Sequence, residues 1–162
     1  MIKKILNHFR PIFYIQVWEK RIRVTNVKTR EVINEIPQLL IEKVSNQVLA
    51  YGTKAIISDN QSELINPFSH PRTLIADSMY AEQLLALIIK QLAANRWIKF
   101  SPIAIIQPME KLDGGLTAVE IKAFKTLLLA AGARQATVYV GKELNLDNFT
   151  FRSVQDISSI DA

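Results

Sequence analysis

The feature that most constrains the fold of this chain is a change of hydrophobic period near residue 77. Before that point, short segments rich in β-branched and aromatic residues are separated by polar turns, a pattern typical of β-strands joined by tight connections. The pattern predicts strands over residues 12–17, 21–27, 31–36 and 48–51. The segment after Pro37 looks irregular, and residues 58–72, which hold two prolines, are predicted to be a loop.

After residue 77 the apolar residues recur with helical spacing. Asp77 can cap a helix, and the residues from there to about Trp97 are apolar around most of the helix circumference, which predicts a buried helix. Thr117 and Glu120 have the spacing of a capping box, and Gly132 stands where a left-handed C-terminal cap is expected. These signals predict a parallel strand–helix–strand unit over residues 103–107, 117–131 and 136–140.

Length and composition favour an α/β globule with one packed core. The 162 residues are 49% hydrophobic, and they divide into a short amphipathic helix (1–10), a single domain (11–142) and an acidic C-terminal tail (143–162). With no cysteine and only His8 and His70, we expect no metal site and no cofactor. The longest apolar run, residues 84–89, is far shorter than the roughly 20 residues of a membrane span. We therefore expect a cytoplasmic location.

The basic charge is concentrated at one end of the chain. Residues 1–30 hold eight basic side chains and one acid, a net of +7, so the remaining 132 residues sum to −2 for a total of +5. Proteins that bind nucleic acid usually spread cations over a docking face. We therefore expect no nucleic-acid partner. An anionic surface contacted by the N-terminus fits the pattern better, and an ordinary solvated arm remains the alternative.

The segment before Pro11 has an apolar side and a basic side. At 100° per residue, its apolar side chains fall within one arc of about 100°. A helix this short needs a surface to lie on. The first hypothesis is an anionic membrane, with the apolar side chains in the acyl boundary and the basic ones at lipid phosphates. The alternatives are a groove on its own domain or on a partner, and disorder. The predicted membrane-binding residues are Ile2, Lys3, Lys4, Ile5, Leu6, Phe9 and Arg10.

A possible partner-binding site lies between the first two predicted strands. Trp18 stands on this turn beside Lys20 and Arg21. An exposed indole flanked by cations can anchor a protein partner or sit at a membrane interface. A Trp side chain folded over the edge of the sheet is an equally good interpretation.

Other candidate sites are weaker. Gly114 and Gly115 precede the capping box and lack the Lys and Ser/Thr of a P-loop, which favours a simple turn. Glu110 and Asp113 have no matched acid–base partner, so we expect them in a solvated loop. His70 lies in a proline-rich loop and is expected to be exposed.

Several stretches of the chain resemble the N-terminal half of the MreB family of bacterial actin homologues, the rod-shape-determining proteins. They follow one another along the chain in the same order as in the family. The N-terminal MIKKILNHF is similar to that family's membrane-binding helix. The most specific stretch, residues 115–140, is similar to G-x-T-x-V-E-R-R-A-[VI]-x-x-A-A-x-x-A-G-A-x-x-V-Y-L. The others are NEIPQLLI (34–41), VLAYGTKA (48–55) and NPFSHPRTLIAD (66–77). The resemblance implies an actin-like, ribonuclease H-like half-sheet: three antiparallel strands, a helix and a parallel βαβ unit.

The chain departs from the family where the family binds nucleotide. The family's first phosphate loop, D-L-G-T-A-N, is replaced here by Gln16-Val17-Trp18-Glu19-Lys20, which lacks both the carboxylate and the glycine. Glu143 aligns with a family glutamate associated with hydrolysis, but without the loop we expect it to activate nothing. The resemblance ends near residue 143, where the family's second domain begins, so we expect only one wall of the nucleotide cleft.

The function expected from these observations is non-catalytic. We expect an MreB-like pseudo-actin, peripheral at the inner face of the cell membrane, that acts as a scaffold or modulator of actin-like filaments or cell-shape machinery. Its expected partners are the membrane and a protein, and self-association is also open. The alternatives are a cytoplasmic adaptor of a secretion or pilus-type assembly, or half of a nucleotide site completed by a partner chain.

Overall fold

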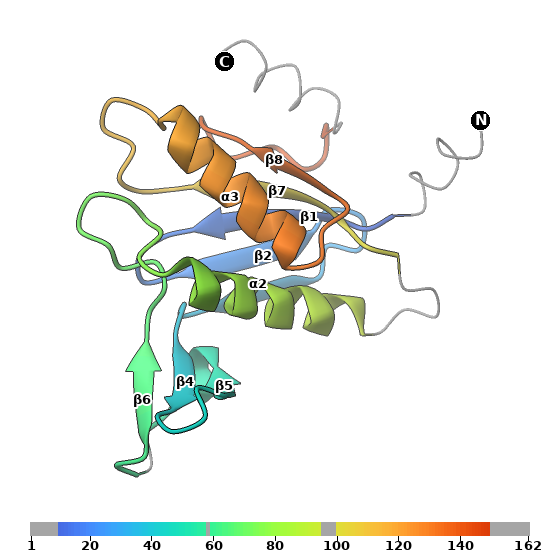
Figure 1. The fold of residues 1–162 in the computed structure, drawn as a ribbon. Coiled ribbons are helices and arrows are strands. Elements are labelled where there is room, and N and C mark those ends of the chain that lie inside the picture. The colour runs from blue at the N-terminus through green and yellow to red at the C-terminus, as the bar shows by residue number, and fades with distance from the viewer. Residues whose placement is uncertain (1–9, 58, 95–99, 150–162) are drawn as a thin grey trace.

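The computed structural model describes residues 10–57, 59–94 and 100–149, and its main element is a five-stranded mixed sheet (Figure 1). The strand order is β3-β2-β1-β7-β8. The predicted α/β class and the order of three antiparallel strands, a helix and a parallel βαβ unit are confirmed. The strands are β1 (Ile12–Val17), β2 (Ile22–Asn26), β3 (Val32–Glu35), β7 (Ile103–Pro108) and β8 (Gln135–Val138).

Strand β1 is the centre of this sheet. It pairs antiparallel with β2 and parallel with β7, and Gln16 stands opposite Gln107 in the parallel ladder. Because successive side chains point to opposite faces, Phe13 and Ile15 enter the main core while Tyr14 and Gln16 lie on the other face. All four are buried, so both faces of β1 are covered.

Two helices, α2 (Ser78–Ala93) and α3 (Ala118–Ala130), cover one face of the sheet (Figure 1). The predicted caps are confirmed: Asp77 accepts from the backbone N–H of Tyr80, and Thr117 and Glu120 form the capping box. The predicted end of the first helix, near residue 97, lies outside the described residues. The apolar side chains of both helices form the main core with the sheet, among them Leu84, Leu85, Ile88, Leu92, Phe124 and Leu128.

The predicted strand over residues 48–51 is confirmed as β5 (Val48–Tyr51). The prediction of irregular structure on either side of β5 is wrong, because both segments contribute a strand to a second, three-stranded sheet. The other two strands of this sheet are β4 (Leu39–Glu42) and β6 (Ser62–Ile65), and the strand order is β5-β4-β6. Strand β6 is short and half-exposed, so its sequence carries little alternation. Leu39 and Ile41 of β4 are fully buried and join the main core, which attaches this sheet to the rest of the molecule.

The face of the main sheet opposite the helices is crossed by residues 142–149, which we call the strap. Its Leu144, Leu146 and Phe149 pack against a small cluster of Tyr14, Ile105 and Tyr139. Thr25 of β2 pairs with Tyr14 in the ladder and is also buried.

Candidate functional site

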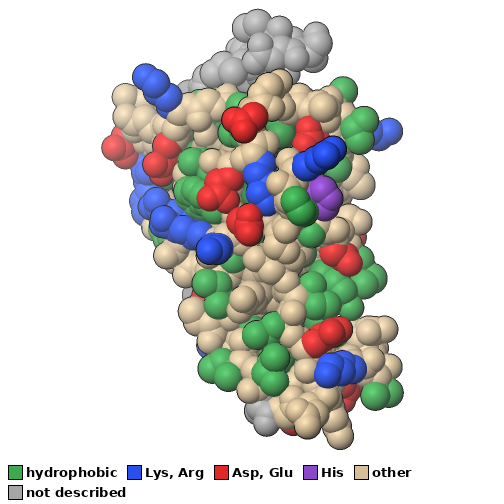
Figure 2. Space-filling model, turned by 90° about the vertical axis from the view of Figure 1, so that its left-hand side faces the viewer, with side chains coloured by type: hydrophobic (Ala, Val, Ile, Leu, Met, Phe, Trp, Pro, Cys, Tyr) green, Lys and Arg blue, Asp and Glu red, His purple; other side chains and the backbone are tan. Residues whose placement is uncertain are grey.

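The carboxyl ends of the parallel strands β1 and β7 lie side by side and define the candidate site. In α/β sheets, ligands usually bind in the crevice outside these ends. Two connections meet here: residues 18–21 between β1 and β2, which we call the hairpin, and residues 109–117 between β7 and α3. Figure 2 views the molecule from this end and shows acidic and basic side chains interspersed on its surface.

The hairpin is closed by the chain's own acceptors. The backbone N–H of Trp18 donates to the carbonyl of Arg21 over 2.8 Å. The backbone N–H of Glu19 donates to Oε2 of Glu110 over 2.7 Å. A phosphate loop binds anions through backbone N–H groups that point at the ligand. Both of these N–H groups already have an acceptor within the chain.

A lysine from the neighbouring connection completes this arrangement. Nζ of Lys111 lies 2.9 Å from Oε2 of Glu19 and also donates to the carbonyl of His70. Nδ2 of Asn66 donates to the carbonyl of Glu19 over 2.7 Å. We call Glu19, Asn66, Glu110 and Lys111 the hairpin clasp. The ion pair is partly exposed, so it adds little to overall stability, but it joins the hairpin to the loop after β7.

The three residues predicted to bind a partner lie together on the hairpin. The guanidinium of Arg21 stacks 4.9 Å from the ring centroid of Trp18, and its Nε donates to Oδ1 of Asn34 over 2.7 Å. Trp18 is half-buried, whereas Lys20 and Arg21 are exposed. The indole is therefore held against Arg21, and the two cations form the outer surface of the hairpin.

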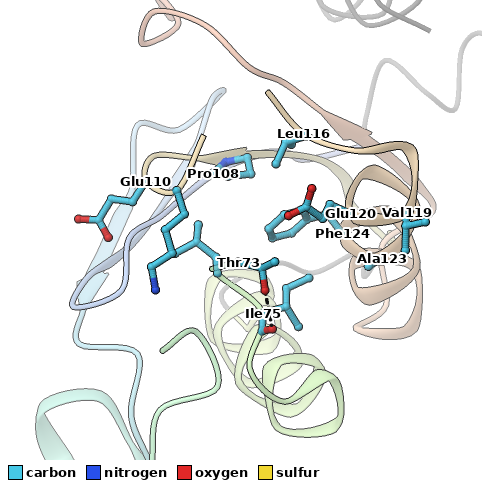
Figure 3. Close-up of a pocket in the computed structure, with 11 residues that line it drawn as sticks. Thr73, Ile75, Pro108, Glu110, Leu116, Val119, Glu120, Ala123 and Phe124 are labelled. Carbon is cyan, nitrogen blue, oxygen red and sulfur yellow. Dashed lines mark hydrogen bonds between the residues drawn. The ribbon is translucent and has the colours of Figure 1, made fainter. Parts of the chain in front are cut away.

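Sequence reasoning missed the role of Glu110. Glu110 is exposed in the loop after β7, as predicted, but its carboxylate also accepts from the hairpin and points away from the neighbouring pocket (Figure 3). A signal was present: Glu19 is the lone acid among the first 30 residues and follows a strand whose parallel neighbour ends near Glu110 and Lys111. Glu19 and Glu110 are 91 residues apart, so their contact could not be predicted from proximity in the sequence.

Other candidate residues behave as simple structural elements. Gly114 and Gly115 both have φ of 81°, and the Gly115 N–H donates to the carbonyl of Leu112, so the predicted turn is confirmed. His70 is exposed, as predicted. Glu143 contacts Nη1 of Arg23 over 3.5 Å and thus belongs to the strap rather than to the clasp.

Of the seven predicted membrane-binding residues, the structure describes only Arg10. Its guanidinium stacks 5.5 Å from the ring centroid of Phe100, and Nη1 donates to the carbonyl of Ser101 over 3.0 Å. The other six lie outside the described residues. Within the described part of the chain, no helix has the length and apolarity to span a membrane, and no group of three or more acidic or histidine side chains is placed to hold a metal.

A pocket of about 190 Å³ lies beside the clasp, between the end of β7, the start of α3 and the segment before α2 (Figure 3). Its wall is mainly apolar, with Leu74, Leu116 and Phe124, and Lys111 and Glu120 add charge. Lys111 is engaged by the clasp and Glu120 by the capping box. The pocket thus offers space for a small apolar group, and no reaction is assigned to it.

Comparison with solved structures defines the fold. The chain superimposes on a crystal structure of MreB 5 of Spiroplasma citri bound to AMPPNP with a TM-score of 0.61, covering 80% of this chain at 19% identity. The structure of that protein bound to ADP gives a TM-score of 0.64 over 82% of the chain, also at 19% identity. The chain has the fold of part of an MreB protein. It spans 38% of the length of either MreB structure.

The comparison supports the fold and no finer statement. At 19% identity, similarity to MreB shows architecture alone. No protein-family model matches the chain, and no curated protein matches its sequence. The MreB-like, actin-like fold predicted from the sequence motifs is therefore confirmed by the structure, and the function has to be argued from the site.

The clasp makes a testable prediction about Glu19. The hydrogen bond from Lys111, followed by its charge, lowers the pKa of the Glu19 carboxyl. A lowered pKa in the folded state stabilises the fold above the ordinary glutamate pKa, and this stabilisation is lost as pH falls through the lowered pKa. We expect an NMR titration to show the Glu19 pKa returning toward its ordinary value in Lys111→Gln.

The matched control is Lys90→Gln, which removes an exposed lysine from α2. It should leave the Glu19 pKa where it is in the unaltered chain. An unchanged Glu19 pKa in Lys111→Gln, or an equal change in both variants, would show that the clasp does not form in solution.

Proposed function

We propose that this chain is an MreB-like pseudo-actin without ATPase activity, which acts at the inner face of the cell membrane as a scaffold or modulator of actin-like filaments or cell-shape machinery. The observation that carries the proposal is the hairpin clasp. The clasp holds the hairpin, and by the sequence resemblance the hairpin corresponds to the first phosphate loop of the family.

Three properties of the hairpin oppose phosphate binding. It has no glycine, so side chains limit how closely the backbone can approach an anion. The N–H groups of Trp18 and Glu19 already donate within the chain. The carboxylates of Glu19 and Glu110 would both repel a phosphate, and Lys111 is already paired with the first of them. The two MreB structures are bound to AMPPNP and ADP, and we infer that this chain has lost that capacity.

Calorimetry with ATP and Mg²⁺ tests this part of the proposal. We expect no binding tighter than about 1 mM, because the N–H groups of Trp18 and Glu19 already donate within the chain and two carboxylates lie beside them. Phosphate release should equal that of Glu143→Gln, which changes the glutamate that the resemblance associates with hydrolysis. Tighter binding, or a rate of phosphate release that Glu143→Gln abolishes, would favour the enzyme hypothesis instead.

The membrane part of the proposal uses the two ends of β1. Arg10 and Pro11 lie at the amino end of β1, whereas the hairpin lies at its carboxyl end. A six-residue strand is about 20 Å long. If the N-terminal segment lies on anionic lipid, the hairpin with Trp18, Lys20 and Arg21 is presented at the opposite end of the sheet. This geometry favours one contact with lipid and a separate contact with protein.

Vesicle co-sedimentation tests the membrane contact. We expect the intact chain to sediment with vesicles that contain anionic lipid and much less with neutral vesicles, because both the apolar and the basic residues are required. Phe9→Asp should abolish sedimentation. Asn7→Asp, which introduces the same charge on the basic side, should reduce it less. Equal sedimentation of all three proteins would contradict the membrane anchor.

A further inference from the structure

The strap, residues 142–149, lies on the sheet face that the helices do not cover. The chain leaves β8, passes Gly141 and crosses the face toward the β2–β3 turn, where Arg30 lies. Leu144, Leu146 and Phe149 rest on Tyr14, Ile105 and Tyr139. The strap has no regular secondary structure, so its hold depends on side chains rather than on a ladder of backbone hydrogen bonds.

The strap and the sheet are complementary in charge. Glu143 lies 3.5 Å from Nη1 of Arg23, and Asp147 lies 2.7 Å from Nη2 of Arg30. Arg30 also donates to the carbonyl of Leu146 over 3.0 Å. Residues 143–147 of the strap therefore have a simple pattern: two acids at the ends, two apolar residues inside them, and one residue in the middle. The face beneath the strap contacts both acids and both apolar residues.

The surface under the strap is held in shape by contacts within the domain. The hydroxyl of Tyr14 donates to Oε1 of Gln107, and Nε2 of Gln107 donates to the carbonyl of Gly141 over 2.7 Å. Burial raises the pKa of Tyr14 to about 12, so the hydroxyl keeps its proton, and with it this donor role, well above neutral pH. The same oxygen accepts from the N–H of Leu144 over 3.3 Å. A peptide therefore meets a preformed surface with an acceptor for its backbone.

The strap itself is held weakly. Both of its ion pairs are exposed, with the Asp147 side chain 84% and the Glu143 side chain 57% accessible. Exposed ion pairs contribute little. Its three apolar side chains are only half-buried. Segments with few buried contacts and exposed hydrogen bonds open locally at low cost. The strap is thus the part of this face most readily displaced.

We propose that this sheet face is a peptide-binding site, and that the strap is its intramolecular ligand. The partner would supply a segment with the same pattern as residues 143–147: two acids that flank two apolar side chains separated by one residue. The proposal deepens the proposed function by assigning a surface to its protein partner. If the peptide-binding proposal fails, the results expected from the calorimetric and vesicle experiments do not change. Failure of this proposal can therefore be distinguished from failure of the proposed function.

Peptide binding in trans tests the proposal. The probe is a labelled, end-blocked peptide with the sequence of residues 142–149, and its affinity is measured by fluorescence anisotropy. The strap is released in the double variant Leu144→Asp/Leu146→Asp. We expect this variant to bind the peptide about tenfold or more tightly than the unaltered chain, because a covalently attached competitor has a high effective concentration. Equal affinity for both proteins, or no binding to the variant, would overturn the proposal.

Charge reversal provides the matched control. In the strap-released background, Arg30→Glu should weaken binding of the peptide severalfold, and a peptide in which the residue corresponding to Asp147 is arginine should recover the lost affinity. Lys90→Glu, which makes the same change on α2, should have no effect. Restoration is a readout that a general loss of folding cannot produce. Failure of the exchanged pair to recover the affinity would contradict the assigned contact.

A second measurement covers the case in which the double variant does not fold. In the unaltered chain, the N–H of Leu144 donates to the hydroxyl oxygen of Tyr14 over 3.3 Å, so we expect its exchange to be slowed. A saturating excess of the peptide should accelerate hydrogen exchange at Leu144 and leave exchange in β7 unchanged. Unchanged exchange at Leu144 in the presence of the peptide would show that the peptide and the strap do not compete.

Discussion

Burial of β1 on both faces is the constraint on which the rest of the structure depends. The central strand, of sequence Ile-Phe-Tyr-Ile-Gln-Val, is buried on both faces, so each side of the sheet has a cover. Helices α2 and α3 cover one side with a large apolar core, and the strap covers the other with three half-buried side chains and two exposed ion pairs. The strong cover fixes the fold, and the weak cover is where a partner can compete.

The same strand also determines the character of the candidate site. Its carboxyl end leads directly into the hairpin, at the edge where α/β sheets commonly bind ligands. Here that edge is filled by Glu110 and Lys111 from the loop after β7. The chain thus retains an MreB-like architecture while using the contacts at this edge to hold two of its own loops together. This difference between fold and site is the basis on which we propose a binding role rather than a catalytic one.

Local signals in the sequence predicted most of the fold, because they do not depend on distant residues. The apolar pattern of residues 12–17, the Asp77 cap and the Thr117–Glu120 capping box all act within a few residues. Strand β6 was missed because a short, half-exposed strand carries little periodicity. The clasp was missed for a different reason: its partners Glu19 and Glu110 are 91 residues apart, and only the parallel pairing of β1 with β7 brings them together. The ion pairs of the strap with Arg23 and Arg30 likewise join residues that are far apart in the sequence.

The central claim is that the hairpin is already occupied by the chain's own groups. Backbone amide NMR of residues 16–21 and 109–111 tests it most directly, recorded with and without several millimolar ATP and Mg²⁺. We expect these amides to keep their shifts and the Glu19 N–H to remain bonded to Glu110. Shifts confined to these residues, together with loss of that hydrogen bond, would mean that nucleotide displaces the clasp and would contradict the account.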